Sequence, residues 1–212
     1  MTELELVDLC GLLYSTDEGW DQLWPESQWG LCAALKVAGA HDVVIHRGSI
    51  TPMDWYDDAC SEAGVDDPDL GLVPGGFYWP LRSWDRAARM AIRPGAIIIG
   101  HSLGAARAVI HAALLAARGD PPLAVIALGC PRAGTAKLQQ VLGATPIRWY
   151  RNASDPVPEV PLTVPWLLPW VHPGIEIKLK EPGIGASPLK DHHFELYRAG
   201  VAKMPGGGPR WA

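Results

Sequence analysis

The stretch that most constrains the fold of this chain is AIIIGHSLGAARAVIHAALLAAR, at residues 96–118. It begins with three consecutive β-branched isoleucines, which favour a buried strand, and it ends in a long apolar run of good helix formers. Between the two lies the pattern Gly-x-Ser-x-Gly at residues 100–104, which leaves almost no residues for a loop. The sequence therefore predicts a strand that turns sharply into a helix, with a serine at the turn.

Segments of these two kinds alternate along much of the chain. We expect strands at DVVIH, AIIIG, LAVIALG and PIRWYRN, and helices at SWDRAARMA, LGAARAVIHAALLAAR, TAKLQQVL and DHHFELYRAGVA. Such alternation is typical of an α/β fold, in which helices cover both faces of a mostly parallel sheet. IEIKLK alternates like an edge strand, and residues 3–14 should form a short helix. WGLCAALKVAGAH fits either a buried helix or a hairpin strand, and its periodicity does not decide between them.

The remaining segments have little periodicity. Residues 49–81 and the stretch DPVPEVPLTVPWLLPW are rich in breakers, so both are expected to be long loops, and loops of that length are usually functional. Residues 206–212, GGGPRWA after Pro205, should form a loose tail. At 212 residues the chain is most simply one domain, spanning 1–212.

Composition excludes several classes of function. The net charge of −5, without a run of lysine or arginine, argues against nucleic acid and against strong attraction to anionic membranes. No apolar run approaches the roughly 18 residues of a membrane span, and the acidic start MTELELVDLC is unlike a secretory signal, so we expect a cytoplasmic protein or one without a classical signal peptide. The four cysteines are scattered and form no Cys-x-x-Cys, which favours reduced thiols and no metal site.

The serine of the turn has either a structural or a chemical role. A strand-to-helix elbow needs small flanking residues and presents the serine hydroxyl at the carboxyl edge of the sheet, which makes Ser102 a candidate nucleophile. The backbone N–H of Leu103 would then lie at a helix N-terminus, where it can stabilise a developing oxyanion. A purely structural serine is the alternative.

A nucleophilic serine needs a histidine base and an acid that orients it, expected in the chain order serine, acid, histidine. Asp155, after the strand PIRWYRN, is the best candidate acid, although an aspartate before proline can simply cap a turn. Asp120 follows a helix and is a poor alternative. For the base, the pair His192 and His193 at the start of the last helix is favoured. Among the other histidines that adjoin or follow Ser102, His101 lies in the elbow and should point away from the hydroxyl, His111 should pack against the sheet from the middle of a helix, and His172 precedes an edge strand.

Eight motifs in order give the chain a family resemblance. HRGS, DWYDD, GFYW, GHSLGAA, GCPRAG, YRNASDPVPEVP, WVHPGIEI and DHHFELY run from about residue 41 to 197, and the series resembles the class 3 lipase family of the α/β-hydrolase superfamily. The resemblance implies an α/β-hydrolase fold and triacylglycerol lipase or related carboxylesterase activity, without metal or organic cofactor. It also implies a triad of Ser102, Asp155 and one histidine of the 192–193 pair.

The resemblance assigns further roles. Ser49 would donate the second oxyanion hydrogen bond, the segment after Ser49 would correspond to the family's lid, and His172 would match a non-catalytic element. Within the pair, His192 is the predicted base and His193 the runner-up. The resemblance favours His192 because the family's base often precedes an aromatic residue by five positions, as His192 precedes Tyr197, and Asp191 can in addition cap the last helix. Ala105 departs from the family, which often has glycine there, but alanine is small enough for the elbow to form.

The expected substrate is an ester or lipid small molecule, with at most transient contact with a lipid interface; the oligomeric state stays open. A phospholipase or thioesterase with the same triad, and a binding module that has lost catalysis, are alternatives. Residues 48–81 contain seven acids and no lysine or arginine, which favours soluble or short-chain esters over anionic interfaces. The acids are Asp54, Asp57, Asp58, Glu62, Asp66, Asp67 and Asp69. Alternatively they only solvate a loop, while Trp55, Tyr56, Trp166 and Trp170 present an apolar rim to neutral lipid.

Overall fold

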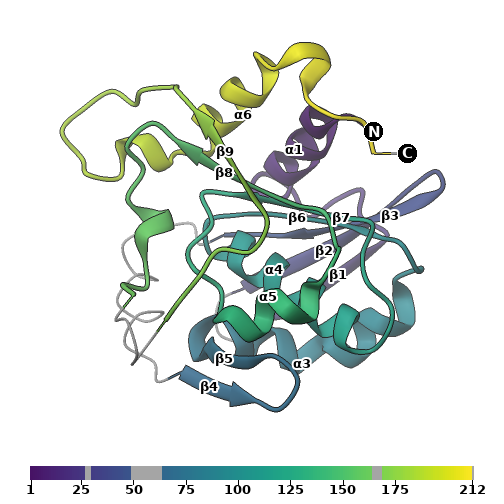
Figure 1. Ribbon diagram of the computed structural model, residues 1–212. Coiled ribbons are helices and arrows are strands. Elements are labelled where there is room, and N and C mark those ends of the chain that lie inside the picture. The colour runs from purple at the N-terminus through teal and green to yellow at the C-terminus, as the bar shows by residue number, and fades with distance from the viewer. Residues whose placement is uncertain (27–29, 49–63, 164–168, 212) are drawn as a thin grey trace.

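A seven-stranded sheet in the order β1-β2-β3-β6-β7-β8-β9 forms the centre of the molecule (Figure 1). The computed structural model describes residues 1–26, 30–48, 64–163 and 169–211. The strands are β1 (Gln22–Glu26), β2 (Gly30–Ala38), β3 (His41–His46), β6 (Ile97–His101), β7 (Ala124–Leu128), β8 (Ile147–Asn152) and β9 (Ile175–Leu179). Strands β1 to β3 are antiparallel, and every pairing from β3 to β9 is parallel. The predicted mostly parallel sheet is therefore confirmed.

Helices cover both faces of this sheet (Figure 1). One layer holds α1 (Glu3–Leu12) and α6 (Phe194–Ala202), and the other holds α3 (Gly75–Ala91), α4 (Leu103–Ala117) and α5 (Ala136–Leu142). The isoleucine run of β6 serves both layers, because successive side chains of a strand point to opposite faces. Ile97 and Ile99 pack in the core beside α1 and α6, whereas Ile98 packs in the core beside α3 and α4.

The ambiguous segment forms a strand in its described part, where β2 runs over Gly30–Ala38. β2 pairs with both of its antiparallel neighbours, and Leu35 lies opposite Val44 of β3. The two strands are joined by a two-residue turn in which Gly39 has φ +63°, the positive value that such hairpin turns require. Pairing on both edges therefore decides between the two structures that the periodicity left open.

The expectation of one long loop over residues 49–81 is wrong for its described part. Strands β4 (Gly64–Asp67) and β5 (Gly71–Pro74) form a hairpin, and α3 begins at Gly75 instead of Ser83. Phe77, Leu81 and Trp84 lie on one buried face of α3 and pack in the core with α4. Burying each such side chain contributes about 1.5–3 kcal/mol, which offsets the poor helix propensity of the glycine pair and of Pro80.

Asp67, one of the acids of the segment matched to the lid, and Trp170, expected in the apolar rim, are both buried. Asp67 is 7% exposed, and its carboxylate accepts hydrogen bonds from the Tyr78 hydroxyl and from the backbone N–H groups of Asp69 and Leu70. Trp170 is 6% exposed. The other residues predicted for the lid or rim at positions 54–62 and 166 lie outside the described residues.

The chain ends also differ from the expected loose tail. The short 3₁₀ helix η3 (Pro205–Gly207) is followed by an antiparallel bridge between Arg210 and Thr2. The amino group of Met1 donates to the Trp211 carbonyl at 2.8 Å, and the Trp211 N–H donates to the Met1 carbonyl at 2.8 Å. Trp211 packs against the core beside α1 and α6. Apolar burial and backbone pairing therefore hold a segment whose composition suggested disorder.

Two expectations drawn from composition can be compared with the described residues. Cys10 and Cys130 are buried free thiols, and burial raises the pKa of Cys10 to about 12, which keeps it protonated and unreactive. None of the described helices combines the length and the apolar character that crossing a membrane requires.

Candidate active site

The sharp turn predicted at Ser102 is present, and only glycine fits on either side of it. Ser102 lies between β6 and α4 with φ 60° and ψ −129°, a backbone conformation that non-glycine residues rarely adopt. A Cβ on Gly100 would lie 2.2 Å from the Gly104 carbonyl oxygen, and a Cβ on Gly104 would lie 2.2 Å from that of His46. The Ser102 N–H donates to the Leu128 carbonyl at 2.9 Å, which anchors the strained turn to β7.

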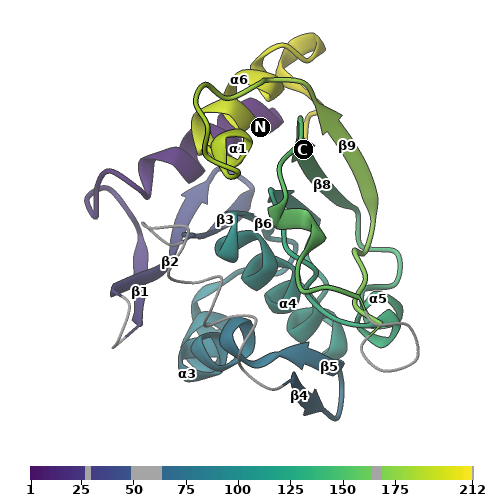
Figure 2. The same cartoon turned by 90° about the vertical axis from the view of Figure 1, so that its left-hand side faces the viewer.

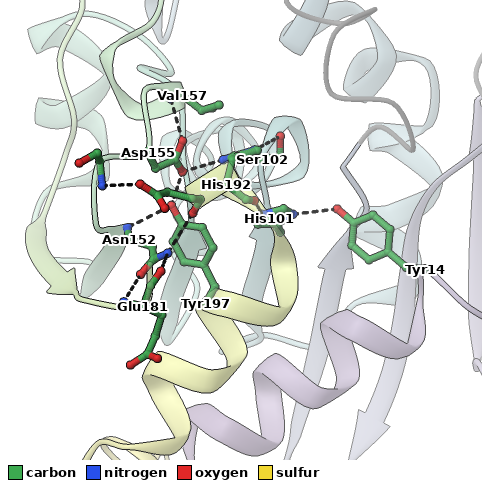
Figure 3. Close-up of polar contacts among 11 residues, drawn as sticks. Tyr14, His101, Ser102, Asn152, Asp155, Val157, Glu181, His192 and Tyr197 are labelled. Carbon is green, nitrogen blue, oxygen red and sulfur yellow. Dashed lines mark hydrogen bonds and ion pairs between the residues drawn. The ribbon is translucent and has the colours of Figure 1, made fainter. Parts of the chain in front are cut away.

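Three of the predicted residues come together at the carboxyl end of the parallel strands (Figure 3). His192 Nε2 lies 2.8 Å from Ser102 Oγ, and His192 Nδ1 lies 2.6 Å from Asp155 Oδ2. Because the carboxylate can only accept, Nδ1 carries the proton, and Nε2 of the neutral ring accepts from the serine hydroxyl. Exposures of 4%, 2% and 0% for Ser102, His192 and Asp155 keep water away from both hydrogen bonds.

The acid of this group is held by more than the histidine. Asp155 follows β8, and its Oδ1 accepts from the Val157 N–H at 2.9 Å. The Tyr197 hydroxyl, from α6, donates to Oδ2, the oxygen that also faces His192. Burial is the main cause that raises the pKa of Tyr197, so the hydroxyl stays a donor. The sequence analysis used Tyr197 only for its distance from His192 along the chain and did not predict this contact.

The turn that carries His192 differs from the prediction. Asp191 does not cap the last helix; it lies in the 3₁₀ turn η2 (Lys190–His192), and α6 begins at Phe194. The Asp191 carboxylate instead accepts from the N–H groups of Gly183 at 2.7 Å and Ser154 at 3.1 Å. The hydrogen bond from Gly183 is the main cause that lowers the pKa of Asp191. The carboxylate therefore ties the turn of His192 to the loop of Asp155.

Asn152, at the end of β8, strengthens the same connection. Its side-chain amide donates to the Asp191 carbonyl at 3.0 Å and to the Glu181 carbonyl at 2.6 Å, and its oxygen accepts from the Glu181 N–H at 2.9 Å. His193, the runner-up for the base, is exposed and has no side-chain role in the cap of α6. The structure thus brings His192 to the serine, whereas His193 faces solvent.

The other histidines have separate surroundings. His111 is buried in α4, as expected, and its Nδ1 lies 3.1 Å from Nε2 of His46 on β3. His172 stacks on Trp149 with ring centroids 4.1 Å apart, and its Nε2 lies 2.8 Å from the Pro158 carbonyl oxygen. His101, expected to point away from the serine hydroxyl, stacks on the His192 ring with centroids 4.9 Å apart. No motif in the sequence indicated that stack.

Of the two predicted oxyanion donors, only one can be assessed. Leu103 is the first residue of α4, and the first N–H groups of a helix have no partner within the helix. Ser49 and the segment predicted as the lid lie outside the described residues. Figure 2 shows from a second side α4, which follows Ser102, β8, which precedes Asp155, and α6, which follows His192.

No metal centre is found in the part of the chain that the structure describes: nowhere in it do three His, Cys, Asp or Glu side chains gather as ligands. The polar groups of the site are instead bonded to one another. The arrangement has the elements of acyl-transfer chemistry, namely a hydroxyl, a base that faces it, an acid behind the base and helix N–H groups beside the hydroxyl.

Comparison with known proteins identifies the family. The model of the class 3 lipases matches residues 43–164, more than half of the chain, and the chain belongs to this family. It is 30% identical to phospholipase A1-II 1 of Oryza sativa subsp. indica over 81% of this chain and 52% of that protein. It is 31% identical to the secreted mono- and diacylglycerol lipase A of Penicillium cyclopium over 57% of this chain and 43% of that protein. The chain thus spans about half the length of these curated relatives or less.

A solved structure supports the fold. The triacylglycerol lipase from Penicillium expansum matches with a TM-score of 0.69 over 89% of this chain and 80% of that one, at 19% identity. Identity this low carries the fold and nothing further. The α/β-hydrolase fold predicted from the motifs is therefore confirmed.

Proposed function

We propose that this protein hydrolyses carboxylic esters through an acyl-enzyme, with Ser102 as nucleophile, His192 as general base and Asp155 as the acid that orients the base. The observation that carries the proposal is the pair of hydrogen bonds at His192, 2.8 Å to Ser102 and 2.6 Å to Asp155. A serine with positive φ supports it, because such strain is costly and is retained mainly where function requires it.

The reaction has two steps. In the first, Ser102 Oγ attacks the ester carbonyl while His192 Nε2 takes its proton, and the Leu103 N–H stabilises the oxyanion. Asp155 holds Nδ1 of the resulting imidazolium, which then gives its proton to the leaving alcohol. In the second step water attacks the acyl-enzyme with His192 again as base, and the acid product leaves.

The substrate class is an ester of a lipid or of a smaller alcohol. Relatives named phospholipase A1 and mono- and diacylglycerol lipase favour acylglycerols, and we rank a phospholipase second on the 30% identity to the rice protein. We propose at most transient contact with a lipid interface and no nucleic acid partner, given the net charge of −5. Soluble or short-chain esters should be preferred over anionic interfaces.

The decisive experiment is labelling with a fluorophosphonate probe together with Ser102→Ala. The wild-type protein should bind one probe covalently and hydrolyse p-nitrophenyl esters, and the variant should do neither while keeping the wild-type melting temperature. Lack of labelling in folded wild-type protein would instead favour a binding module. A panel of glycerides, phospholipids and thioesters then identifies the substrate. A sharp rise in rate when a short-chain ester exceeds its solubility, or tighter binding to anionic than to neutral vesicles, would contradict the preference for soluble esters.

A further inference from the structure

A second set of hydrogen bonds lies directly behind the candidate triad. The Tyr14 hydroxyl, just beyond α1, is 3.1 Å from His101 Nδ1 and 3.0 Å from the backbone nitrogen of Gly48, just beyond β3. On the other side of its ring, His101 Nε2 lies 3.1 Å from the carbonyl oxygen of His192. Segments from three distant parts of the sequence thus meet at one imidazole (Figure 3).

The direction of these hydrogen bonds follows from their partners. The His192 carbonyl can only accept, so His101 Nε2 carries the proton. Burial lowers the pKa of His101 well below its usual value, which keeps the ring neutral and leaves Nδ1 as an acceptor. The Tyr14 hydroxyl therefore donates to Nδ1, and its oxygen accepts from the Gly48 N–H. The three hydrogen bonds thus run in one direction, from the Gly48 N–H through Tyr14 and His101 to the His192 carbonyl, and hydrogen bonds arranged in this way reinforce one another.

Both ends of this series of hydrogen bonds contact the reacting groups. A Cβ on Gly48 would lie 3.1 Å from the Ser102 Cβ and 2.6 Å from the His101 carbonyl oxygen, so Gly48 packs directly against the nucleophile turn. At the other end, the His101 ring stacks on the ring of His192 at 25° between planes. Phe194, the first residue of α6, packs on both Tyr14 and His101, with ring centroids 5.7 Å and 5.4 Å apart.

We propose that Tyr14 and His101 are positioning residues, which fix the base-bearing turn of His192 and the backbone at Gly48 relative to Ser102. The inference rests on the proposed function, because it concerns the same reaction. Neither side chain is required to touch substrate. They instead set the relative positions of the serine, the base and the neighbouring backbone in the transition state. A displacement of 1 Å there costs roughly 100-fold in rate.

Tyr14→Phe tests this with the smallest change, since it removes one hydroxyl and keeps the ring packed on Phe194. We expect kcat and the rate of fluorophosphonate labelling to fall about 10-fold to 100-fold, with KM changed less than about 3-fold. Affinity for a trifluoromethyl ketone, which forms a tetrahedral oxyanion, should fall with kcat. Tyr150→Phe is the matched control. It also loses a buried hydroxyl, one bonded to Glu3 at the start of α1, and it should lower the melting temperature without changing kcat.

A double-mutant cycle tests whether the two residues act together. His101→Phe keeps a ring to stack on His192 but has no acceptor for the Tyr14 hydroxyl, so combining it with Tyr14→Phe should cost clearly less than the product of the single effects. The proposal is overturned if Tyr14→Phe only lowers the melting temperature, as Tyr150→Phe should, or if the single effects multiply. These outcomes presuppose a wild-type enzyme that Ser102→Ala inactivates. A wild-type protein without turnover or labelling would overturn both proposals.

Discussion

Two pairs of buried histidines lie on the same central sheet, and they differ in almost everything except burial. At the carboxyl end of β6, His101 and His192 stack, and each of their four ring nitrogens has a hydrogen-bond partner. Between β3 and α4, His46 and His111 meet edge to face at 83° and bond to each other. Their outer nitrogens, His46 Nδ1 and His111 Nε2, have no protein partner among the described residues.

The difference shows that the hydrogen-bond partners of a buried histidine, and not its burial, determine whether it can act as a base. The ring of His192 has a carboxylate on one side and a hydroxyl on the other, so it can take a proton and stabilise the charge that results. The His46–His111 pair lies against the Trp84 ring, which supplies no acceptor, and burial lowers the pKa of both imidazoles. We expect the first pair to control activity and the second to control stability.

The largest expected effect comes from His192→Ala. Loss of the base should lower kcat about 10⁶-fold, as removal of a triad histidine does elsewhere, while the protein stays folded. His111→Ala should do the opposite, with a lower melting temperature and nearly normal kcat. Steady-state ester hydrolysis and thermal unfolding of both variants measure the contrast. Comparable losses of activity in the two variants would remove the distinction between the pairs.

Asp155→Asn should have the next largest effect. The amide oxygen should stay on the Val157 N–H, which turns the NH₂ group toward His192 Nδ1 and favours the wrong tautomer, so kcat should fall about 10⁴-fold. Val157 and Tyr197 still bond to this position, which limits the structural change. Kinetics at saturating ester, with circular dichroism as the check on folding, give the result. Full activity would mean that the acid lies elsewhere, with Asp120 the first to examine.

Lower stability at acidic pH is the effect expected of the His46–His111 pair. Burial lowers the pKa of His111 to about 4 and that of His46 well below 6.5, so between these values the unfolded chain binds protons that the folded chain does not. The free energy of unfolding should therefore fall as pH drops from about 6.5 to about 4, by about 3 kcal/mol for His111 alone.

Denaturant unfolding across this range measures that loss, and His111→Leu should flatten part of it. His101 and His172 contribute with the same sign, because burial lowers the pKa of each of these imidazoles as well. Asp85 and Arg118, which face His111, act on its pKa in opposite directions. Carboxylates with lowered pKa, such as Asp85 and Asp191, destabilise the protein mainly below this range. A free energy of unfolding that stays constant from pH 6.5 to 4.5 would contradict the assignment.

The smallest effect should come from His193→Ala, although His193 adjoins the proposed base. Its side chain is exposed and caps nothing, so stability should change by no more than about 0.5 kcal/mol and kcat should stay near wild type. Active-site labelling and a melting curve suffice to check it. A loss of activity as large as that of His192→Ala would mean that either histidine can serve as the base.

Sequence reasoning reached the sheet and the elbow because both have strong local signals. Three isoleucines before Gly-x-Ser-x-Gly predict a buried strand and a sharp turn without knowledge of any distant residue. β2 stayed ambiguous because an apolar run has no decisive period, and only its pairing on two edges settles it. The start of α3 was placed too late because Gly75, Gly76 and Pro80 hide a helical pattern that depends on contact with α4.

In the candidate site, too, local sequence patterns predicted some residues and missed the contacts between remote ones. Ser102 and Asp155 follow strands, so their place at the sheet edge could be expected. The interpretation of Asp191 as a helix cap was wrong. Its partners Ser154 and Gly183 come from separate loops, and no local sequence pattern indicates these contacts. The partners of His101 are likewise remote: Tyr14 lies 87 residues away and His192 lies 91 residues away. Contacts of this kind depend on tertiary packing.

The outer edge of β9 affects how separate molecules meet in solution. Among the described residues no strand pairs with this edge, so its free backbone groups offer a template on which another chain can form a ladder. Ile175 is 66% exposed there, which would favour such pairing, but Glu176 and Lys178 alternate with the isoleucines along the strand. An incoming strand would have to bury or oppose these charges, a common protection of sheet edges against aggregation. Residues with no part in the chemistry thus act against the edge-to-edge pairing of separate molecules.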